Sequence, residues 1–429
     1  MKYDRIDRNL FIKNRAKFTA AMEHRSIAFF NSNDIYPISA DSTMPFQQHR
    51  DIFYLSGVDQ EESILVLFPD AFNEEHREML FLRETNEHIA VWEGEKLTKE
   101  AAFETSGIKN VYWLDQFEST MKVVMAQAQN IYFNTNEHTR ANTEVQTRED
   151  RFIKKITKKY PAHGVRKSAT ILHRIRSVKE QEEIDLMQTA CDITKKGVQR
   201  VLDFLKPGVM EYEIEAEIMH EFLRSRSKGF AYTPIIASGK NACVLHYIEN
   251  NAKCEDGDVI LMDFGAEYAN YASDLTRCFP VNGKFTDRQK AVYNAVLNVK
   301  KESEKLLVPG TFLADYHKEV GKLMESELLG LGLIDQTDIK NQDPNWPAFK
   351  KYFMHGTSHF IGLDTHDVGL WTEPLRAGMV FTCEPGIYIP EENLGIRLED
   401  DLVVQSNGSP KNLMGSIPIE ADEIEDLMH

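Results

Sequence analysis

Four acidic residues and one histidine in the C-terminal half of the chain have the types and spacing of metal ligands. Asp263 and Asp274 lie 11 residues apart and flank a predicted hairpin with its turn near 267–270. In an antiparallel pair of strands, residues at such positions can face the same side at close range. Two carboxylates so close repel each other, so we expect a positive charge between them.

The other three candidate ligands follow further along the chain. Glu384 ends an apolar run, Glu399 lies in the strand-like segment GIRLEDDLVV, and His359 lies in MHGTSHFIGLDTH. This oxygen-rich set without thiolates suits ions such as Mn²⁺ better than structural Zn²⁺. Four carboxylates are too many negative charges for one divalent ion, so we expect two ions that share acids. Two ions about 3.5–4 Å apart can share a hydroxide as nucleophile and bind both sides of a tetrahedral intermediate.

Three further histidines lie near these ligands in the sequence: His246, His355 and His366. A lone histidine is more often a surface or core residue than a functional one. Here, however, His246 precedes Asp263 by 17 residues and His366 precedes Glu384 by 18. Neutral imidazoles near such an intermediate can donate to its oxyanion or transfer a proton.

An internal repeat is expected to position these residues. The segments GDVILMDFG (257–265) and GMVFTCEPG (378–386) share the pattern G-x-V-x-x-x-acid-x-G at an offset of 121 residues. The motif L-x-P-G recurs at 205–208 and 307–310, each time before an amphipathic helix. A carboxylate after a buried strand is costly unless it is paired or metal-bound. We therefore expect two similar halves around a pseudo-twofold axis; two ordinary strands with unrelated acids are the alternative.

The chain is predicted to form two domains, residues 1–170 and 171–429. The first reads as an α/β domain without a dinucleotide, P-loop or Cys/His motif, so no chemistry is visible in it. A capping box at 177–180 is expected to begin a helix of the second domain. Elements expected from periodicity are helices over 12–24, 149–159 and 211–224, and strands over 27–30, 63–68, 79–83, 90–92 and 131–133.

The composition excludes several classes of protein. The chain of 429 residues is 42% hydrophobic and 27% charged, as in ordinary folded domains. Its net charge of −17, without a basic run, argues against nucleic-acid binding. Five cysteines without a C-x-x-C pair predict reduced thiols and a cytoplasmic protein. The charged N-terminus does not read as a signal peptide, and no apolar stretch reaches the roughly 18 residues of a membrane span.

The five candidate ligands resemble the dinuclear site of the pita-bread metallopeptidases, which include methionine aminopeptidase, prolidase and aminopeptidase P. The segments LHYIEN, DFGAEYANYASDLTRCFPVNGKF, MHGTSHFIGLDTHDVG, CEPGIYI and GIRLEDDLVV are most similar to the aminopeptidase P family, as are RDIFYLSG and VWEG in the N-terminal half. The resemblance implies an α/β N-terminal domain followed by an α+β pita-bread catalytic domain with an internal pseudo-twofold repeat.

The resemblance also implies a role for each ligand. Asp263 would bind one metal, and Asp274 and Glu399 would bridge both. His359 and Glu384 would complete the other metal. Glu384 would also take a proton from the bridging water and pass it to the leaving amine.

Further residues match the family outside the ligand set. His246 and His366 would hold the substrate and the intermediate, and His355 would be a mobile histidine near the metals. Arg397 and Tyr232 would surround the ligands, with Tyr232 at the substrate-binding site. Trp92 would line the substrate pocket from the leading domain, although a tryptophan in a strand is more often a core residue.

Together these residues imply a metal-dependent exopeptidase that releases an N-terminal residue preceding proline. Two divalent ions per chain are expected, Mn²⁺ first, with Co²⁺ or Zn²⁺ as alternatives. The resemblance also implies a homodimer or homotetramer. The X–Pro bond is a tertiary amide and needs a dedicated pocket. Two alternatives remain: a prolidase that cleaves X-Pro dipeptides only, and a binding protein of the same fold without activity.

Overall fold

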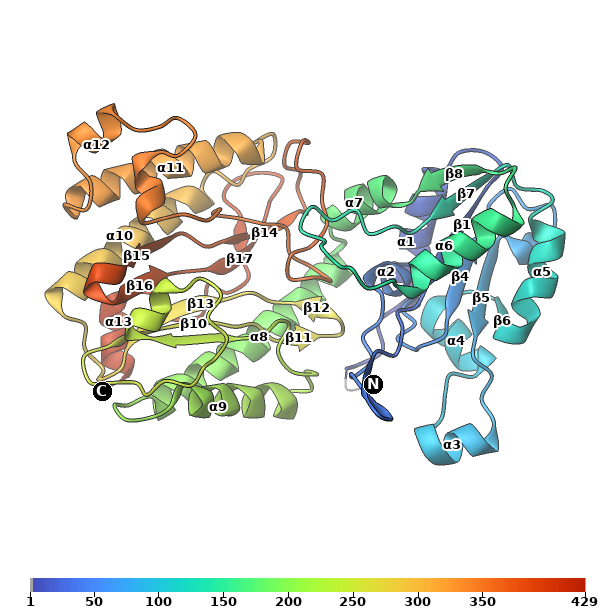
Figure 1. The fold of residues 1–429 in the computed structure, drawn as a ribbon, viewed down its shortest axis with the longest axis horizontal. Helices are drawn as coiled ribbons and strands as arrows, with labels where there is room; N and C mark the ends of the chain where they lie inside the picture. Colours follow the sequence, from blue (N-terminus) through green and yellow to red (C-terminus); the bar gives the residue numbers. More distant parts are fainter. Residues whose placement is uncertain (1–2, 429) are drawn as a thin grey trace. The chain divides into compact units, whose positions relative to one another are not determined.

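The computed structural model describes residues 3–428, which form two compact units (Figure 1). Residues 5–176 make up the N-terminal unit. Residues 177–428, together with Tyr3 and Asp4, make up the C-terminal unit. Within residues 3–428, no helix is both long enough and apolar enough to cross a membrane.

The N-terminal unit is built on a six-stranded mixed sheet in the order β6-β5-β4-β1-β7-β8. The strands are β1 (Ser26–Asn31), β4 (Ile64–Leu67), β5 (Glu78–Leu82), β6 (Asn110–Trp113), β7 (Asn130–Phe133) and β8 (Gly164–Lys167), besides a hairpin of β2 (Pro37–Ser39) and β3 (Ser42–Thr43). The helices are α1 (Arg8–Ala20), α2 (Arg50–Ser56), α3 (Glu87–Glu93), α4 (Lys99–Ser106), α5 (Phe117–Val124), α6 (Arg148–Lys159) and α7 (Ala169–Ser177).

Helices cover both faces of this sheet, because alternate residues of each strand point to opposite sides. On one face, Phe29 and Phe81 pack on Phe117 of α5, with ring centroids 6.2 and 5.1 Å away. On the other face, Phe30 packs on Phe18 of α1 at 5.2 Å. The predicted α/β domain is therefore confirmed, and β1, β4, β5 and β7 fall on predicted strands.

The predicted strand at 90–92 is wrong, because these residues lie in the short helix α3. The side chain of Asn86 caps this helix by accepting from the Ile89 N–H at 2.9 Å. The side chain of Trp92 is 77% exposed, so Trp92 is not a core residue. A four-residue apolar run (89–92) carries too little periodicity to separate a strand from a helix.

The predicted capping box at 177–180 is also wrong. Ser177 is the last residue of α7 and is itself helical, so it cannot serve as the N-cap of the next helix. Glu180 takes that position, and its N–H donates to the Glu183 side chain at 2.8 Å. The box therefore exists three residues later, with glutamate in place of serine.

The C-terminal unit contains two three-stranded sheets, β13-β10-β9 and β14-β17-β18, with two small hairpins and helices outside them (Figure 1). The strands are β9 (Ile235–Ser238), β10 (Val259–Asp263), β11 (Glu267–Tyr268), β12 (Tyr271–Ala272), β13 (Thr276–Pro280), β14 (Val380–Cys383), β15 (Gly386–Ile389), β16 (Leu394–Arg397), β17 (Asp400–Val403) and β18 (Lys411–Asn412). The helices are α8 (Gln181–Phe204), α9 (Glu211–Arg224), α10 (Asp287–Glu304), α11 (Leu313–Gly330), α12 (Gln336–Lys340) and α13 (Ala421–Leu427).

The predicted internal repeat is confirmed in this unit. The repeated segments form β10 and β14, and each pairs antiparallel with a later strand, β13 or β17. The repeated L-x-P-G motif joins α8 to α9 in one half and follows α10 before α11 in the other. An antiparallel bridge between Thr276 and Glu399 connects the two halves. This bridge brings the acid-bearing strand ends to a common junction.

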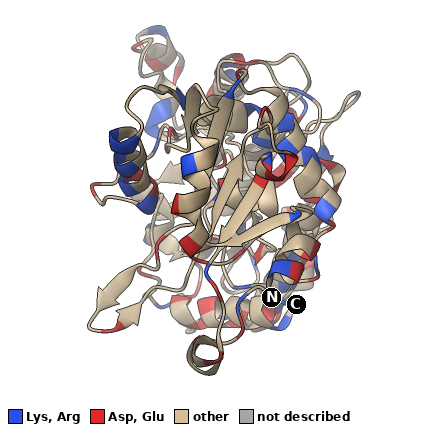
Figure 2. Ribbon diagram, turned by 90° about the vertical axis from the view of Figure 1, so that its right-hand side faces the viewer, with Lys and Arg blue, Asp and Glu red and all other residues tan. Residues whose placement is uncertain are grey.

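Acidic and basic residues are distributed over most of the elements (Figure 2). The densest group of basic residues lies on α6, whose sequence is REDRFIKKITKK. Lys155 and Lys159 of this helix both form ion pairs with Glu118 of α5. The basic charge of α6 is therefore partly neutralised within its own unit.

Candidate active site

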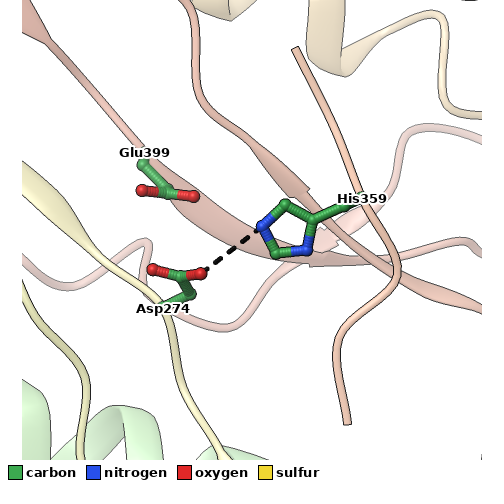
Figure 3. Close-up of side chains that lie close together, drawn as sticks. All are labelled: Asp274, His359 and Glu399. Atoms are coloured by element: carbon green, nitrogen blue, oxygen red, sulfur yellow. Dashed lines mark ion pairs between the residues drawn. The ribbon is translucent and has the colours of Figure 1, made fainter. Parts of the chain in front are cut away.

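Asp274, His359 and Glu399 lie together at the junction of the two halves (Figure 3). One ligand atom from each lies within 4.8 Å of the others. The Nε2 atom of His359 is 3.5 Å from Asp274 Oδ2 and also 3.5 Å from Glu384 Oε1. Asp274, His359 and Glu399 are at most 6% exposed. Residues far apart in the sequence therefore form one buried polar group, and Glu384 contacts it through His359.

Tyr232 connects Asp263 to Asp274. Its hydroxyl oxygen lies 2.6 Å from Asp263 Oδ1 and 2.5 Å from Asp274 Oδ1. Asp263 ends β10 opposite Thr276, and Asp274 lies just before that partner strand begins. Burial, reinforced by the negative charges of both aspartates, raises the pKa of Tyr232 well above its usual value. The hairpin predicted from spacing is confirmed, and a phenol joins its two acids.

Arg397 supplies a buried positive charge to this group. Its Nη2 donates to Asp263 Oδ2 at 2.6 Å, and its Nη1 donates to the Tyr388 hydroxyl at 2.9 Å. Its Nε donates to Thr276 Oγ1 at 3.2 Å. Burial alone would lower the pKa of Arg397, but Tyr388, Asp263 and Glu399 together raise it well above its usual value. Arg397 therefore remains charged and fixes the orientation of Asp263.

The carboxylates of the site are crowded and buried, which favours their neutral forms unless a cation is bound. Burial and the adjacent Asp263 raise the pKa of Asp274 well above its usual value. Burial and neighbouring acids do the same for Glu399. Burial raises the pKa of Glu384 to about 7, although the His359 charge opposes this. One guanidinium does not balance four carboxylates, so the oxygen-rich donor set fits divalent metal ions.

His355 is held close to Glu384 in a defined orientation. Its Nδ1 lies 2.7 Å from the Gly356 carbonyl oxygen and 3.7 Å from Glu384 Oε2. Since a carbonyl only accepts, Nδ1 carries the hydrogen, and Nε2 accepts from the Tyr388 hydroxyl at 2.8 Å. Burial and the nearby charge of Arg397 lower the pKa of His355 to about 3. His355 is therefore neutral near pH 7.

The two other predicted histidines lie on exposed loops of the C-terminal unit. The His366 ring packs edge-on against the His359 ring, with centroids 4.5 Å apart. His246 follows the short 3-10 helix η3 (Gly239–Cys243), and its charge contributes to the lowered pKa of His355. Trp92 belongs to the N-terminal unit and is exposed.

Sequence reasoning missed two hydroxyl residues at the junction. Tyr388 hydrogen-bonds to both His355 and Arg397, and Thr276 donates to Glu399 Oε2 at 2.6 Å. Both residues lie in predominantly apolar strands close after a candidate ligand in the sequence. A buried hydroxyl in such a strand needs a partner. This rule would have indicated both residues.

Comparisons with known proteins agree with this architecture. The model of metallopeptidase family M24 matches residues 185–406, and that of the aminopeptidase P N-terminal domain matches residues 11–132. The Xaa-Pro aminopeptidase of Escherichia coli is 34% identical, with 99% of this chain and 98% of that protein covered.

Solved structures agree as well. A Bacillus anthracis structure assigned to aminopeptidase P is 34% identical, covers 99% of this chain and 98% of that chain, and superimposes with a TM-score of 0.91. Escherichia coli aminopeptidase P with the inhibitor Pro-Leu is 32% identical, with 99% of each chain covered and a TM-score of 0.88. The chain therefore belongs to metallopeptidase family M24, with the pita-bread fold in its C-terminal unit and an aminopeptidase P N-terminal domain before it.

Proposed function

We propose that this protein is a metal-dependent Xaa-Pro aminopeptidase, which releases an N-terminal residue that precedes proline. The observation that carries the proposal is the buried group of carboxylates and one imidazole at the junction of the two halves. Its full-length relative in Escherichia coli is named Xaa-Pro aminopeptidase, and a related structure holds the inhibitor Pro-Leu. A peptide with proline at its second position is the corresponding substrate here.

We propose that the site holds two divalent metal ions, most suitably Mn²⁺, with Co²⁺ and Zn²⁺ as alternatives. Asp274 and Glu399 would be shared by both ions. The remaining ligands would be Asp263 for one ion, and His359 with Glu384 for the other. When bound, such ions lower the pKa of water to give a nucleophile and polarise the scissile carbonyl.

Glu384 is the carboxylate best suited to proton transfer. Its side chain is 19% exposed, whereas that of Asp274 is 6% exposed, so a substrate and a water molecule can reach Glu384 more easily. A general base must lie within hydrogen-bond reach of the proton that it removes. The adjacent neutral His355 turns its Nδ1–H toward the Gly356 carbonyl and lies 3.7 Å from Glu384 Oε2. We assign Glu384 as the general base and His355 as its neighbour in proton transfer.

His366 and His246 are proposed to contact the peptide. His366 packs on His359 and is open to solvent, a position from which it can donate to a substrate oxygen. Arg397 and Tyr232 orient the aspartates, and Tyr232 is proposed to lie at the edge of the substrate site. Trp92 of the leading domain is proposed to contact substrate; its side chain is exposed and therefore accessible to a peptide.

The remaining features of the proposal concern the whole protein. We propose that the leading domain ends near residue 170 and that the catalytic domain follows it. We also propose a cytoplasmic homodimer or homotetramer. The acidic net charge of −17 supports a protein that does not bind nucleic acid.

The test of substrate class is hydrolysis of matched peptides by the Mn²⁺-loaded enzyme. Gly-Pro-Gly should be cleaved to glycine and Pro-Gly, while Gly-Ala-Gly, which lacks proline, should be cleaved far more slowly. Cleavage of Gly-Pro but not of Gly-Pro-Gly would identify a prolidase instead. Failure to cleave either peptide, with the metal bound, would identify a binding protein of the same fold.

A further inference from the structure

The segment that carries His246 is a loop between β9 and β10. It begins with η3 and continues through residue 252 as irregular structure. His246 lies near its middle, and its side chain is exposed. Burial does not hold an exposed side chain in place, so the position of His246 depends on how the loop is anchored.

One buried carboxylate, that of Glu211, binds both ends of this loop. Its Oε1 accepts from the Ser238 N–H at 2.7 Å and from Asn241 Nδ2 at 3.2 Å. Its Oε2 accepts from the Tyr247 hydroxyl at 2.7 Å and from the Ala252 N–H at 2.8 Å. Glu211 is 0% exposed. Four donors, one from the last residue of β9 and three from separate parts of the loop, therefore converge on the first residue of α9.

A second contact anchors the last part of the loop to the same helix. Asn250 Nδ2 donates to Glu215, one helical turn after Glu211, at 2.9 Å, and to the Pro234 carbonyl at 3.0 Å. Asn250 Oδ1 accepts from the Ile236 N–H at 2.9 Å. Asn250 is 3% exposed and has a φ of 45°. The end of the loop is thus held to α9 and to β9, while Tyr247, next to His246, is held to α9 through Glu211.

The first part of the loop packs against the active site. Ala242 of η3 lies so close to Gly395 of β16 that a Cβ atom on Gly395 would come within 2.3 Å of the Ala242 carbonyl oxygen. The same strand ends in Arg397, which binds Asp263. An anchor that fixes η3 therefore fixes the approach of His246 to the site.

We infer that Glu211 is a positioning residue of the active site, whose carboxylate sets the place of His246 by fastening the loop at both ends. The inference rests on the proposed contact of His246 with substrate. Tyr247 is the direct connection, because it follows His246 in the chain and donates to Glu211. Each carboxylate oxygen of Glu211 accepts two hydrogen bonds. In Glu211→Gln an NH₂ group replaces one of these oxygens, so the two donors that face it lose their acceptor.

The test is a double-mutant cycle on the Mn²⁺-loaded enzyme with Gly-Pro-Gly as substrate. The variants are Glu211→Gln, His246→Ala and the two combined. Glu211→Gln should lower kcat/KM by about 10- to 100-fold, the size expected for a misplaced group. Because both changes act through His246, adding Glu211→Gln to His246→Ala should cost less than about threefold more. Bound metal should stay at the wild-type level throughout, since Glu211 contacts none of the proposed ligands.

Two further variants make the outcome decisive. Glu217→Gln makes the same change on the same helix, where the carboxylate pairs with Arg200 at 2.5 Å, and should leave kcat/KM near wild type. Tyr247→Phe removes one of the four hydrogen bonds and should give a smaller loss of the same kind, which keeps the test open if Glu211→Gln folds poorly. Wild-type activity in both Glu211→Gln and Tyr247→Phe, fully multiplicative losses in the cycle, or a parallel loss of metal would each overturn the inference. Wild-type activity of His246→Ala would instead reject the substrate role of His246, and the inference with it, while leaving the metal centre in place.

Discussion

Thr276 and Glu399 are hydrogen-bonded to each other twice, through both side chain and backbone. The Thr276 hydroxyl donates to Glu399 Oε2 at 2.6 Å, and the Glu399 N–H donates to the Thr276 carbonyl at 3.1 Å. Each residue comes from a different half of the internal repeat. The contact that joins the halves therefore also orients one of the candidate metal ligands, so the fold and the site are assembled together.

Replacing Thr276 by valine tests this relationship. Thr276→Val keeps the shape of the side chain but removes the hydroxyl that donates to Glu399 and accepts from Arg397 Nε, which should cost about 1–3 kcal/mol of stability. We expect weaker metal binding as well, because Glu399 loses its orientation. Metal titration and urea unfolding measure the two effects. Thr276→Ser restores the hydroxyl and should recover most of the metal affinity; equal losses in both variants would contradict the proposed role of this bond.

The histidines should separate into ligands and substrate contacts. His359→Ala removes a proposed ligand, so both metal content and activity should fall. His366→Ala should keep the metal while kcat/KM falls by about 10²- to 10⁴-fold, as for loss of a proton-transfer or oxyanion contact. Elemental analysis of each purified variant beside its peptidase rate distinguishes the two classes. An empty metal site in His366→Ala would show that this histidine has been assigned the wrong role.

The sequence predicted those parts of the protein that depend on local pattern and on the cost of burying charge. Asp263 at the end of β10 and Glu384 just after β14 are recognisable because a carboxylate after a buried strand needs a partner. The repeat of these strands then predicted that Asp263 and Glu384 meet at a junction, although nothing local says how closely.

Contacts formed only by tertiary packing were not predictable in this way. The hydrogen bonds of Thr276 depend on how the two halves meet. Those of Tyr388 depend on how His355 and the β15–β16 hairpin come together, and those of Glu211 depend on how a loop folds back on α9. The predicted strand at Trp92 is wrong because the apolar run there is only four residues long. Periodicity cannot decide such short segments, where caps and neighbouring charges determine the structure.

The stability of the N-terminal unit should depend on pH through Glu149. Burial raises the pKa of Glu149 to about 7, although Asn31 Nδ2 donates to it at 2.6 Å. In the unfolded chain this carboxyl returns to its usual pKa of about 4.5. Between these values the folded state holds the extra proton, so the free energy of unfolding falls as pH rises from about 4.5 to 7, by about 3 kcal/mol at most from this group.

Glu149→Gln checks this dependence by removing the titrating proton. The amide is neutral at every pH, and its nitrogen can donate to Asn31 Oδ1, which has no hydrogen-bond partner in the wild-type structure. Urea unfolding at pH 5 and pH 8 should show that the free energy of unfolding changes less between these pH values in the variant than in the wild type. At pH 8 the variant should be more stable than the wild type. If the free energy of unfolding changed equally in variant and wild type between pH 5 and pH 8, Glu149 would already be ionised in the folded protein.

Glu384 is assigned two roles, and a conservative substitution separates them. Glu384→Gln keeps one coordinating oxygen but removes the basic carboxylate, so at least one metal ion should stay bound while hydrolysis nearly stops. Glu384→Ala removes the ligand atom too and should lose more metal. If Glu384→Gln retained more than about a tenth of the wild-type rate, less than about 1.4 kcal/mol of transition-state stabilisation would depend on the carboxylate. The base would then have to be another residue, with His355 the first to test.

The central claim is that the carboxylate and histidine group at the junction acts by holding two metal ions. The most direct measurement is a titration of metal-stripped protein with Mn²⁺, in which bound metal and Gly-Pro-Gly hydrolysis are followed in the same samples. We predict no hydrolysis without metal and a maximum rate when about two ions are bound per chain. Full activity of the stripped protein, or a maximum rate reached with no metal at this group, would contradict the account.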